Sequence, residues 1–361
     1  MTQAMMPVHG GDIYSEKVEL DFSVNLNPAG MDAEAAALIE DAFSESYEQA
    51  RCYPDIIQRD VRPALASLSK VGAENVYAGS GASELIMGIC HMIRPQKALI
   101  IEPSFQGYAF ALSSVGTCRT DRIFLSEEKG FELTEETVSI DEETDIVFIQ
   151  DPWNPTGRNT DEDIIISLID RAEQCGAAVV LDESFFGISE KSLIVPERAG
   201  EFISRCSRLF IIRSFTKSFA LPGIRMGYAI SSPENITELM RHLPEWNLSC
   251  TSSSVMKACA KIAAESDFLS ASVRYIREER VFLMDGLRRL GMKVFESDTV
   301  FLLFRYDGNK DLYRELLEKK ILIRDCEMIP GLQKGFYRIA VRRRKDNEKL
   351  LAAMDEVING N

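Results

Sequence analysis

The chain has 361 residues, of which 45% are hydrophobic and 27% are charged, a composition typical of a globular protein with one or two domains. Its 41 Lys and Arg residues against 56 Asp and Glu residues give a net charge of −15, which disfavours binding to nucleic acid or to an anionic membrane surface. The apolar runs are far shorter than the roughly 18 residues that span a bilayer.

Cysteine and histidine usage narrows the chemistry further. The eight cysteines stand singly, without a CxxC pair or zinc spacing, and the first residues lack the basic and apolar regions of a secretory signal. We therefore expect a protein of the reducing cytoplasm. With only His9, His91 and His242, we expect no multi-histidine metal centre and few candidates for a Ser-His-Asp triad.

Short apolar runs alternate with helical patterns through the first two thirds of the chain. An Ala-rich stretch after Asp32 and residues 62–70 predict helices. Strand-like runs follow at 75–78, 98–101, 145–149, 177–181, 209–212 and 227–230. Continuous apolar strands separated by helices predict an α/β domain whose mostly parallel sheet is covered on both faces.

The pattern changes after residue 267. It predicts a long amphipathic helix over 268–290, a strand over 299–304, a helix over 311–319, short strands near Ile321 and Tyr337, and a final helix. The few strands indicate a small mixed sheet. We therefore expect an N-terminal arm over 1–31, a large domain over 32–267 and a smaller α+β domain over 268–361.

Polar residues gather directly after the predicted strands, where open α/β sheets bind their ligands. The first strand leads into GSGASE at 79–84 and then a helical run. Free backbone N–H groups at such a turn suit a phosphate. A Gly/Ser turn that only caps a helix is the commoner arrangement, so this segment indicates a site only together with others.

Two further strand ends carry an amide and a carboxylate. The turn DPWNPTG at 151–157 holds Asn154 between prolines, and DE follows a strand at 182–183. A carboxylate such as Asp182 at the mouth of a buried sheet is costly unless it meets a cation or a protonated ring nitrogen.

A lysine and an arginine follow the strand at 209–212. Lys217 stands in RSFTKSFALPGIRMG, at 213–227, and is either a solvated loop residue or a buried amine. A buried lysine loses its proton readily, and the neutral amine forms a Schiff base with an aldehyde. Arg225 can bind a phosphate through its planar fork. Amine, carboxylate, hydroxyls, glycine N–H groups and arginine together predict a site for pyridoxal 5'-phosphate.

In the combination NPTG, DE and SFTKSFALPGIRMGY the chain resembles the fold-type I pyridoxal-phosphate enzymes of the class I and II aminotransferase family, over nearly its whole length. The resemblance implies a seven-stranded sheet, with Lys217 as the Schiff-base lysine and Asp182 on the pyridinium nitrogen. It also implies that Asn154 contacts the ring hydroxyl. The residues that it places on the cofactor phosphate are Gly81, Ala82, Ser83, Ser214, Thr216 and Arg225.

Two tyrosines gain roles from the same resemblance. Tyr108, in PSFQGY, looks like the ring that stacks on the cofactor, although a tyrosine packed in a helix is the alternative. Tyr53, in RCYPD, resembles the tyrosine that reaches the cofactor phosphate of a neighbouring subunit. This role implies a homodimer with shared active sites, whereas an ordinary turn tyrosine would imply nothing about assembly.

Substrate contacts are implied as well. Arg338 stands in an apolar strand, where an arginine is expensive unless it meets an anion, and the resemblance makes it the ligand of a substrate α-carboxylate. Arg324 looks like a ligand of a substrate phosphate, unless it pairs with a neighbouring carboxylate. His9 and Asn27 are implied to border the same pocket.

Two reactions stay open within this family. The segments HGG at 9–11, DFSVNLNP at 21–28 and RDC at 324–326 favour decarboxylation of L-threonine O-3-phosphate to (R)-1-amino-2-propanol O-2-phosphate, a step of cobalamin biosynthesis. The alternative is an aminotransferase that acts on histidinol phosphate or a related amino acid. Ser184 and Phe185 depart from the more usual Ala-Tyr after DE. A third hypothesis, a cofactor-binding protein without activity, conflicts with the presence of Lys217, Asp182, Arg225 and Arg338 together.

Overall fold

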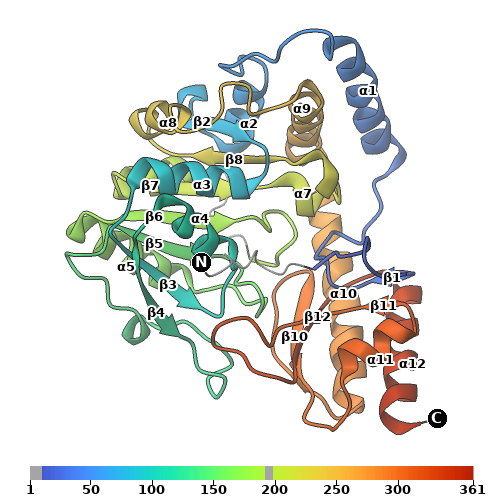
Figure 1. Cartoon of the computed structure of the whole chain (residues 1–361). Coiled ribbons are helices and arrows are strands. Elements are labelled where there is room, and N and C mark those ends of the chain that lie inside the picture. The colour runs from blue at the N-terminus through green and yellow to red at the C-terminus, as the bar shows by residue number, and fades with distance from the viewer. Residues whose placement is uncertain (1–9, 192–197, 361) are drawn as a thin grey trace.

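Residues 10–191 and 198–360 are described by the computed structural model, so the predicted substrate contact His9 lies outside the described residues. A large sheet wrapped by helices forms one part of the molecule, and a smaller sheet with the C-terminal helices lies beside it (Figure 1). Among the helices of these residues, none has both the length and the apolar character that crossing a bilayer requires.

The large sheet has seven strands in the order β2-β8-β7-β6-β5-β3-β4. They are β2 (Val76–Gly79), β3 (Lys97–Glu102), β4 (Arg119–Phe124), β5 (Ile146–Gln150), β6 (Ala178–Glu183), β7 (Leu209–Arg213) and β8 (Gly227–Ile230). β8 runs antiparallel to both of its neighbours, and the other neighbouring pairs are parallel. The predicted α/β fold with a mostly parallel seven-stranded sheet is therefore confirmed.

β4 was not among the predicted strands. Its residues are half-buried or exposed rather than buried, and it lies at the end of the sheet. An edge strand with polar residues lacks the continuous apolar run that identifies the inner strands.

Both faces of the large sheet are buried. Alternate residues of β6 enter different apolar clusters, Val179 and Leu181 on one face and Val180 on the other. The first cluster packs against α1 (Ala33–Gln49), α2 (Val61–Ser69), α5 (Glu162–Cys175), α6 (Ala199–Arg205) and α9 (Cys250–Glu265), and the second packs against α3 (Ala82–Ile93), α4 (Gly107–Val115) and α8 (Pro233–Met240). This two-sided burial explains why the inner strands are apolar throughout.

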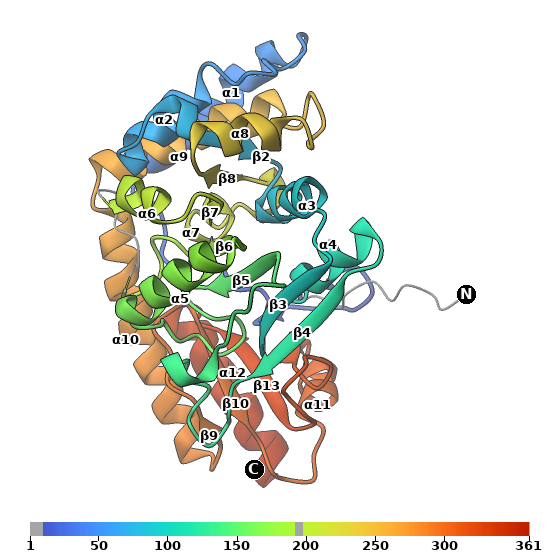
Figure 2. The same ribbon diagram turned by 90° about the vertical axis from the view of Figure 1, so that its left-hand side faces the viewer.

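The C-terminal part holds a second sheet with the strand order β12-β13-β10-β9. Its elements are α10 (Phe268–Arg289), β9 (Lys293–Val294), β10 (Phe301–Arg305), α11 (Leu312–Glu318), β11 (Ile321–Leu322), β12 (Arg324–Asp325), β13 (Phe336–Ala340) and α12 (Arg344–Asn359). All three strand pairings in this sheet are antiparallel, so the expectation of a mixed sheet was wrong. In Figure 2, α10 runs along one side of the molecule from the region of α9 to the C-terminal elements.

The N-terminal segment is attached to the C-terminal part. β1 (Leu20–Asp21) pairs in parallel with β11, and the amide of Ala340 donates to the carbonyl of Phe22 at 2.7 Å. This pairing brings residues 22–27 towards the large sheet. The division of the chain at 31/32 and 267/268 stays a prediction.

A buried ion pair joins two strand ends of the large sheet. Arg213 Nε donates to Glu183 at 2.8 Å, both side chains are buried, and these two residues are register partners at the ends of β7 and β6. The guanidinium also lies 4.3 Å from the ring centroid of Phe186. Because Asp182 precedes Glu183 and Ser214 follows Arg213, the pair fixes the backbone from which two predicted site residues project.

Candidate active site

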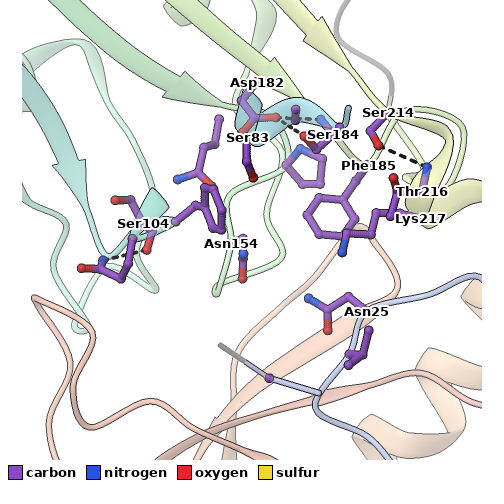
Figure 3. A pocket seen from close by; sticks show the side chains of 18 of the residues that line it. Asn25, Ser83, Ser104, Asn154, Asp182, Ser184, Phe185, Ser214, Thr216 and Lys217 are labelled. Atoms are coloured by element: carbon purple, nitrogen blue, oxygen red, sulfur yellow. Dashed lines mark hydrogen bonds between the residues drawn. The ribbon is translucent and has the colours of Figure 1, made fainter. Parts of the chain in front are cut away.

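A cavity of about 280 Å³ lies where the carboxyl ends of the parallel strands meet the small sheet. The large-sheet side contributes the ends of β5 and β6, the segment after β7 and the start of α3. The small sheet contributes Arg324 and Arg338, and the N-terminal segment contributes Asn25. Figure 3 shows Asn25 on the opposite side of the cavity from Asp182 and Ser214.

Most of the predicted site residues line this cavity. Those that do are Gly81, Ala82, Ser83, Asn154, Asp182, Ser214, Thr216, Lys217, Arg225, Arg324 and Arg338. Three others do not: Asn27 and Tyr108 are buried behind its walls, and Tyr53 is exposed at the surface. Residues spread over more than 250 positions of the chain are thus brought together by the strand ends.

The glycine-rich turn forms a cradle at the start of α3. Gly81 has a φ of +86°, and a Cβ there would lie 2.7 Å from Nη2 of Arg225. A Cβ on Gly227 would lie 2.6 Å from the backbone nitrogen of Ala82. Glycine at these two positions therefore allows the turn, the neighbouring strand and a guanidinium to approach closely, and it leaves the N–H groups of the helix start for an anion.

Hydroxyl groups complete the same corner of the cavity. Ser214 caps the short helix α7 (Phe215–Ser218), and its Oγ accepts from the amide of Thr216 at 3.1 Å. Both hydroxyls donate to the carbonyl of Met226, at 2.6 Å from Ser214 and 3.1 Å from Thr216. The two side chains are thereby held beside Arg225.

A network behind the cradle was not predicted from the sequence. Glu84 accepts from the amide of Ser80 at 2.7 Å and from Nδ2 of Asn247 at 3.1 Å. Gln58 donates to the carbonyl of Ala78 at 2.8 Å and to Asn247 at 3.2 Å. Gln58 and Asn247 are isolated polar residues far from the turn in sequence, and no local pattern marks them.

Lys217 is half-buried and supplies the amine of the site. Burial, together with the charges of Arg338 and Arg225, lowers the pKa of Lys217 to about 8, while Asp182 opposes this shift. About one tenth of the amine is therefore neutral at pH 7, far more than for an ordinary lysine, and the neutral form is the nucleophile. Asn27 supports the lysine from behind, because its amide donates to the carbonyl of Lys217 at 3.0 Å and its side chain donates to the carbonyl of Ser218 at 2.8 Å.

Asp182 is the next-to-last residue of β6 and is buried, and burial raises the pKa of its carboxyl group. Its two oxygens accept hydrogen bonds from Ser184 and from Tyr108, and these bonds oppose the rise. The prediction that Tyr108 stacks on a cofactor does not fit its position: its ring stacks on Phe148, with centroids 4.7 Å apart. Phe105, three residues earlier, lines the cavity and meets Tyr108 edge-on, and Phe185 is a second aromatic ring in the lining.

Two arginines face each other on the wall formed by the small sheet. Arg324 and Arg338 are direct register partners on β12 and β13. Arg338 donates to Asn154 and to the carbonyl of Ser23, whereas its Nε has no hydrogen-bond partner among the described residues. Burial, with a further contribution from Arg324, lowers the pKa of Arg338 to about 10. Like charges directly opposite each other are destabilising, so this wall is suited to anions.

Comparison of the chain with known protein families and sequences agrees with this geometry. Residues 17–354 match the class I and II aminotransferase family, and the chain belongs to that family. A threonine-phosphate decarboxylase of Salmonella typhimurium is 31% identical over 372 aligned residues, which cover 98% of this chain and 97% of that protein. A histidinol-phosphate aminotransferase of Caldanaerobacter subterraneus is 28% identical over 85% of this chain and 84% of that protein.

A solved structure extends the likeness to three dimensions. The histidinol-phosphate aminotransferase of Clostridium acetobutylicum superposes with a TM-score of 0.84 at 29% identity, over 95% of this chain and all of that one. The chain is therefore an enzyme, and its family implies pyridoxal 5'-phosphate as the cofactor. The residues fit this group, because the cavity combines an amine with a lowered pKa, a buried carboxylate and a cradle that a Cβ would fill.

The cradle generates a first prediction. In Gly227→Ala the new Cβ must push the backbone of residues 81–82 away from β8, because rigid backbone atoms cannot yield as a side chain can. We expect affinity for pyridoxal phosphate to fall by about 1–3 kcal/mol, or about 5- to 150-fold, in an absorbance titration. Gly223→Ala is the matched control, since a Cβ there meets no described atom within 4 Å. Equal affinities of the two variants would contradict the cradle.

The lowered pKa of Lys217 generates a second prediction. With a pKa of about 8, Lys217 is protonated below and neutral above that pH. The neutral fraction rises from about 0.1 at pH 7 to about 0.9 at pH 9, so covalent capture of pyridoxal phosphate by cofactor-free protein should accelerate about tenfold and then level off. Stopped-flow absorbance measures the rate, with Lys217→Ala as background. A rate that keeps rising to about pH 10, as for an ordinary lysine, would rule out the lowered pKa.

Proposed function

We propose that this enzyme decarboxylates L-threonine O-3-phosphate to (R)-1-amino-2-propanol O-2-phosphate and thereby supplies cobalamin biosynthesis. The observation that carries the proposal is the register of Arg324 opposite Arg338 on the cavity wall. This substrate has a carboxylate and a phosphate within a few bonds of each other, so each guanidinium could bind one anionic group bidentately. The similarity to the Salmonella typhimurium protein along nearly the full chain adds support.

The arginines also bear on the choice of reaction. When bound, pyridoxal phosphate withdraws electrons from the Cα of an amino acid attached to its aldehyde carbon. Which substituent of Cα is lost would depend on how the chain's own residues orient the substrate, so orientation would select the product. Arg338 would hold the α-carboxylate and Arg324 the phosphate, and together they would set that orientation. Lys217 Nζ would hold the proton that replaces the departing CO2 on Cα.

The remaining cavity residues would hold the cofactor. We propose that the phosphate lies in the cradle, with the ring nitrogen at Asp182. Asn154 would contact the ring hydroxyl while its side-chain oxygen accepts from Arg338, which would link the cofactor to the substrate ligand. Phe105 takes the place proposed for Tyr108 beside the ring. The groups proposed for the cradle are Gly81, Ala82, Ser83, Ser214, Thr216 and Arg225.

A second candidate is an aminotransferase acting on histidinol phosphate, which the Clostridium acetobutylicum structure supports at 29% identity. Histidinol phosphate has a phosphate but no carboxylate, so it would leave one of the two arginines to the second substrate of a transamination. Orientation at Cα would then favour loss of the α-proton. Direct assay of both substrates separates the candidates.

The third prediction concerns the reaction that the enzyme catalyses. Cofactor-loaded enzyme should release CO2 from L-threonine O-3-phosphate, measured by trapping, and Lys217→Ala should abolish the release. Arg324→Gln and Arg338→Gln should each lower kcat/KM by about 30-fold or more, since losing one partner of a buried charge pair costs about 2–5 kcal/mol. No CO2, with conversion of 2-oxoglutarate to glutamate in the presence of histidinol phosphate, would overturn the decarboxylase in favour of the aminotransferase.

We also propose a homodimer with shared active sites. Tyr53 is 82% exposed and packs its ring on Trp246, itself 51% exposed, at 4.9 Å between centroids. Ile56 and Ile57 are exposed nearby in sequence. Exposed aromatic and aliphatic side chains of this kind are typical of interfaces, and the hydroxyl of Tyr53 would reach the phosphate of the neighbouring subunit.

Assembly is the fourth prediction. Sedimentation should give a dimer, and Tyr53→Phe should retain it while weakening cofactor binding by about 1.5–3 kcal/mol, the usual contribution of a hydrogen bond to a charged group. Tyr47→Phe, on an exposed tyrosine of α1, is the control and should change neither property. A monomer that binds the cofactor as tightly as the control would exclude the shared site.

A further inference from the structure

Asp182 accepts three hydrogen bonds from groups that the proposed reaction does not otherwise use. The amide of Ser184 donates to Oδ1 at 2.9 Å, and the hydroxyl of Ser184 donates to the same oxygen. Tyr108 Oη donates to Oδ2 at 2.7 Å. Figure 3 shows Ser184 directly beside Asp182, within the wall of the cavity.

The three hydrogen bonds counteract the desolvation cost of keeping Asp182 ionised. Desolvation favours the neutral form of a buried carboxyl group, and burial is the largest influence on the pKa of Asp182, which it raises. Hydrogen bonds to the ionised form act in the opposite direction. A neutral Asp182 could not stabilise a proton on a pyridine nitrogen, because that interaction depends on the negative charge.

The geometry leaves room for a ring nitrogen. Each carboxylate oxygen can accept two hydrogen bonds, and Tyr108 supplies one to Oδ2. Tyr108 is itself fixed, since it is buried and stacks on Phe148 at an interplanar angle of 18°. Ser184 holds the other oxygen from the turn that follows β6. The carboxylate is therefore held at both oxygens while Oδ2 retains an acceptor site.

We propose that Ser184 and Tyr108 are positioning residues that keep Asp182 ionised, so that Asp182 holds a proton on the ring nitrogen of bound pyridoxal phosphate. This inference rests on the proposed cofactor site. It assigns Tyr108 a role through the carboxylate, in place of the predicted stacking, and it assigns the hydroxyl at position 184 to the electronic state of the cofactor.

The test reads the ring nitrogen directly. Wild type, Ser184→Ala, Tyr108→Phe and the double variant are loaded with pyridoxal phosphate labelled with nitrogen-15 in the ring, and the nitrogen chemical shift is followed against pH. We expect the wild-type nitrogen to stay protonated to higher pH, with the midpoint lowered by about one to two pH units in each single variant. Cofactor affinity should fall about tenfold or more in the same variants.

A matched control exists on the surface. Ser207 donates to Glu173 Oε2 through both its amide, at 2.8 Å, and its hydroxyl, at 3.0 Å. Ser207→Ala therefore removes the same kind of hydroxyl from a carboxylate outside the cavity lining and should leave the nitrogen titration unchanged. Ser184→Thr retains a hydroxyl and should restore the wild-type midpoint.

The outcomes distinguish failure of the positioning role from failure of the proposed cofactor site. Wild-type titrations in both Ser184→Ala and Tyr108→Phe would overturn the positioning role while leaving the cofactor site intact. A wild-type protein that fails to capture pyridoxal phosphate through Lys217 would overturn the cofactor site and this inference with it. If Ser184→Ala does not fold, Tyr108→Phe, which removes a single oxygen, decides the question by the same measurement.

Discussion

The structure depends on gathering charges of both signs in the lining of one cavity. Asp182 is buried and Lys217 is half-buried, and each shifts the pKa of the other. The lining also contains Arg225, Arg324 and Arg338, so four cationic side chains face one carboxylate in a protein whose net charge is −15. Burial, and after it the charges of Arg338 and Arg225, lower the pKa of Lys217. The cationic side chains together concentrate positive potential in the cavity. Such a cavity favours anionic ligands, and a cofactor phosphate and an anionic substrate would both qualify.

The fold encloses this cavity from two directions. The large sheet supplies the amine, the carboxylate and the cradle from its strand ends, and the small sheet supplies the paired arginines. Arg338 joins the two, because it donates to Asn154 of the large sheet and to the carbonyl of Ser23 on the N-terminal segment. The β1–β11 pairing anchors that segment to the C-terminal part. The cavity therefore exists only when all three parts of the chain are in place.

Much of this could be predicted from the sequence, and the failures have physical reasons. The inner strands were found because burial on both faces demands unbroken apolar runs, and the residues after them converge because parallel strands end at one edge. β4 was missed because an edge strand tolerates polar residues. Phe105 and Tyr108 are three residues apart, just before and just inside the start of α4, so composition could not tell which ring faces the cavity.

Supporting residues were harder to predict than contact residues. Gln58 and Asn247 hold the cradle through hydrogen bonds that span 189 positions of sequence between them. Their amide side chains fit many environments, and only the tertiary fold determines their partners. Contact residues, by contrast, must be of particular chemical types at strand ends, and this restriction leaves a pattern.

The hydrogen bonds of Asn27 around Lys217 show what such supporting residues do. The backbone of Asn27 binds the carbonyl of Lys217, and the side chain of Asn27 bridges the carbonyl of Ser218 and the hydroxyl of Ser272 on α10. The lysine backbone is thus fixed from the N-terminal segment and from α10. Movement of the amine is left to its flexible four-carbon side chain. In the proposed reaction one nitrogen must reach both the aldehyde carbon and Cα, and a fixed backbone with a mobile side chain satisfies both demands.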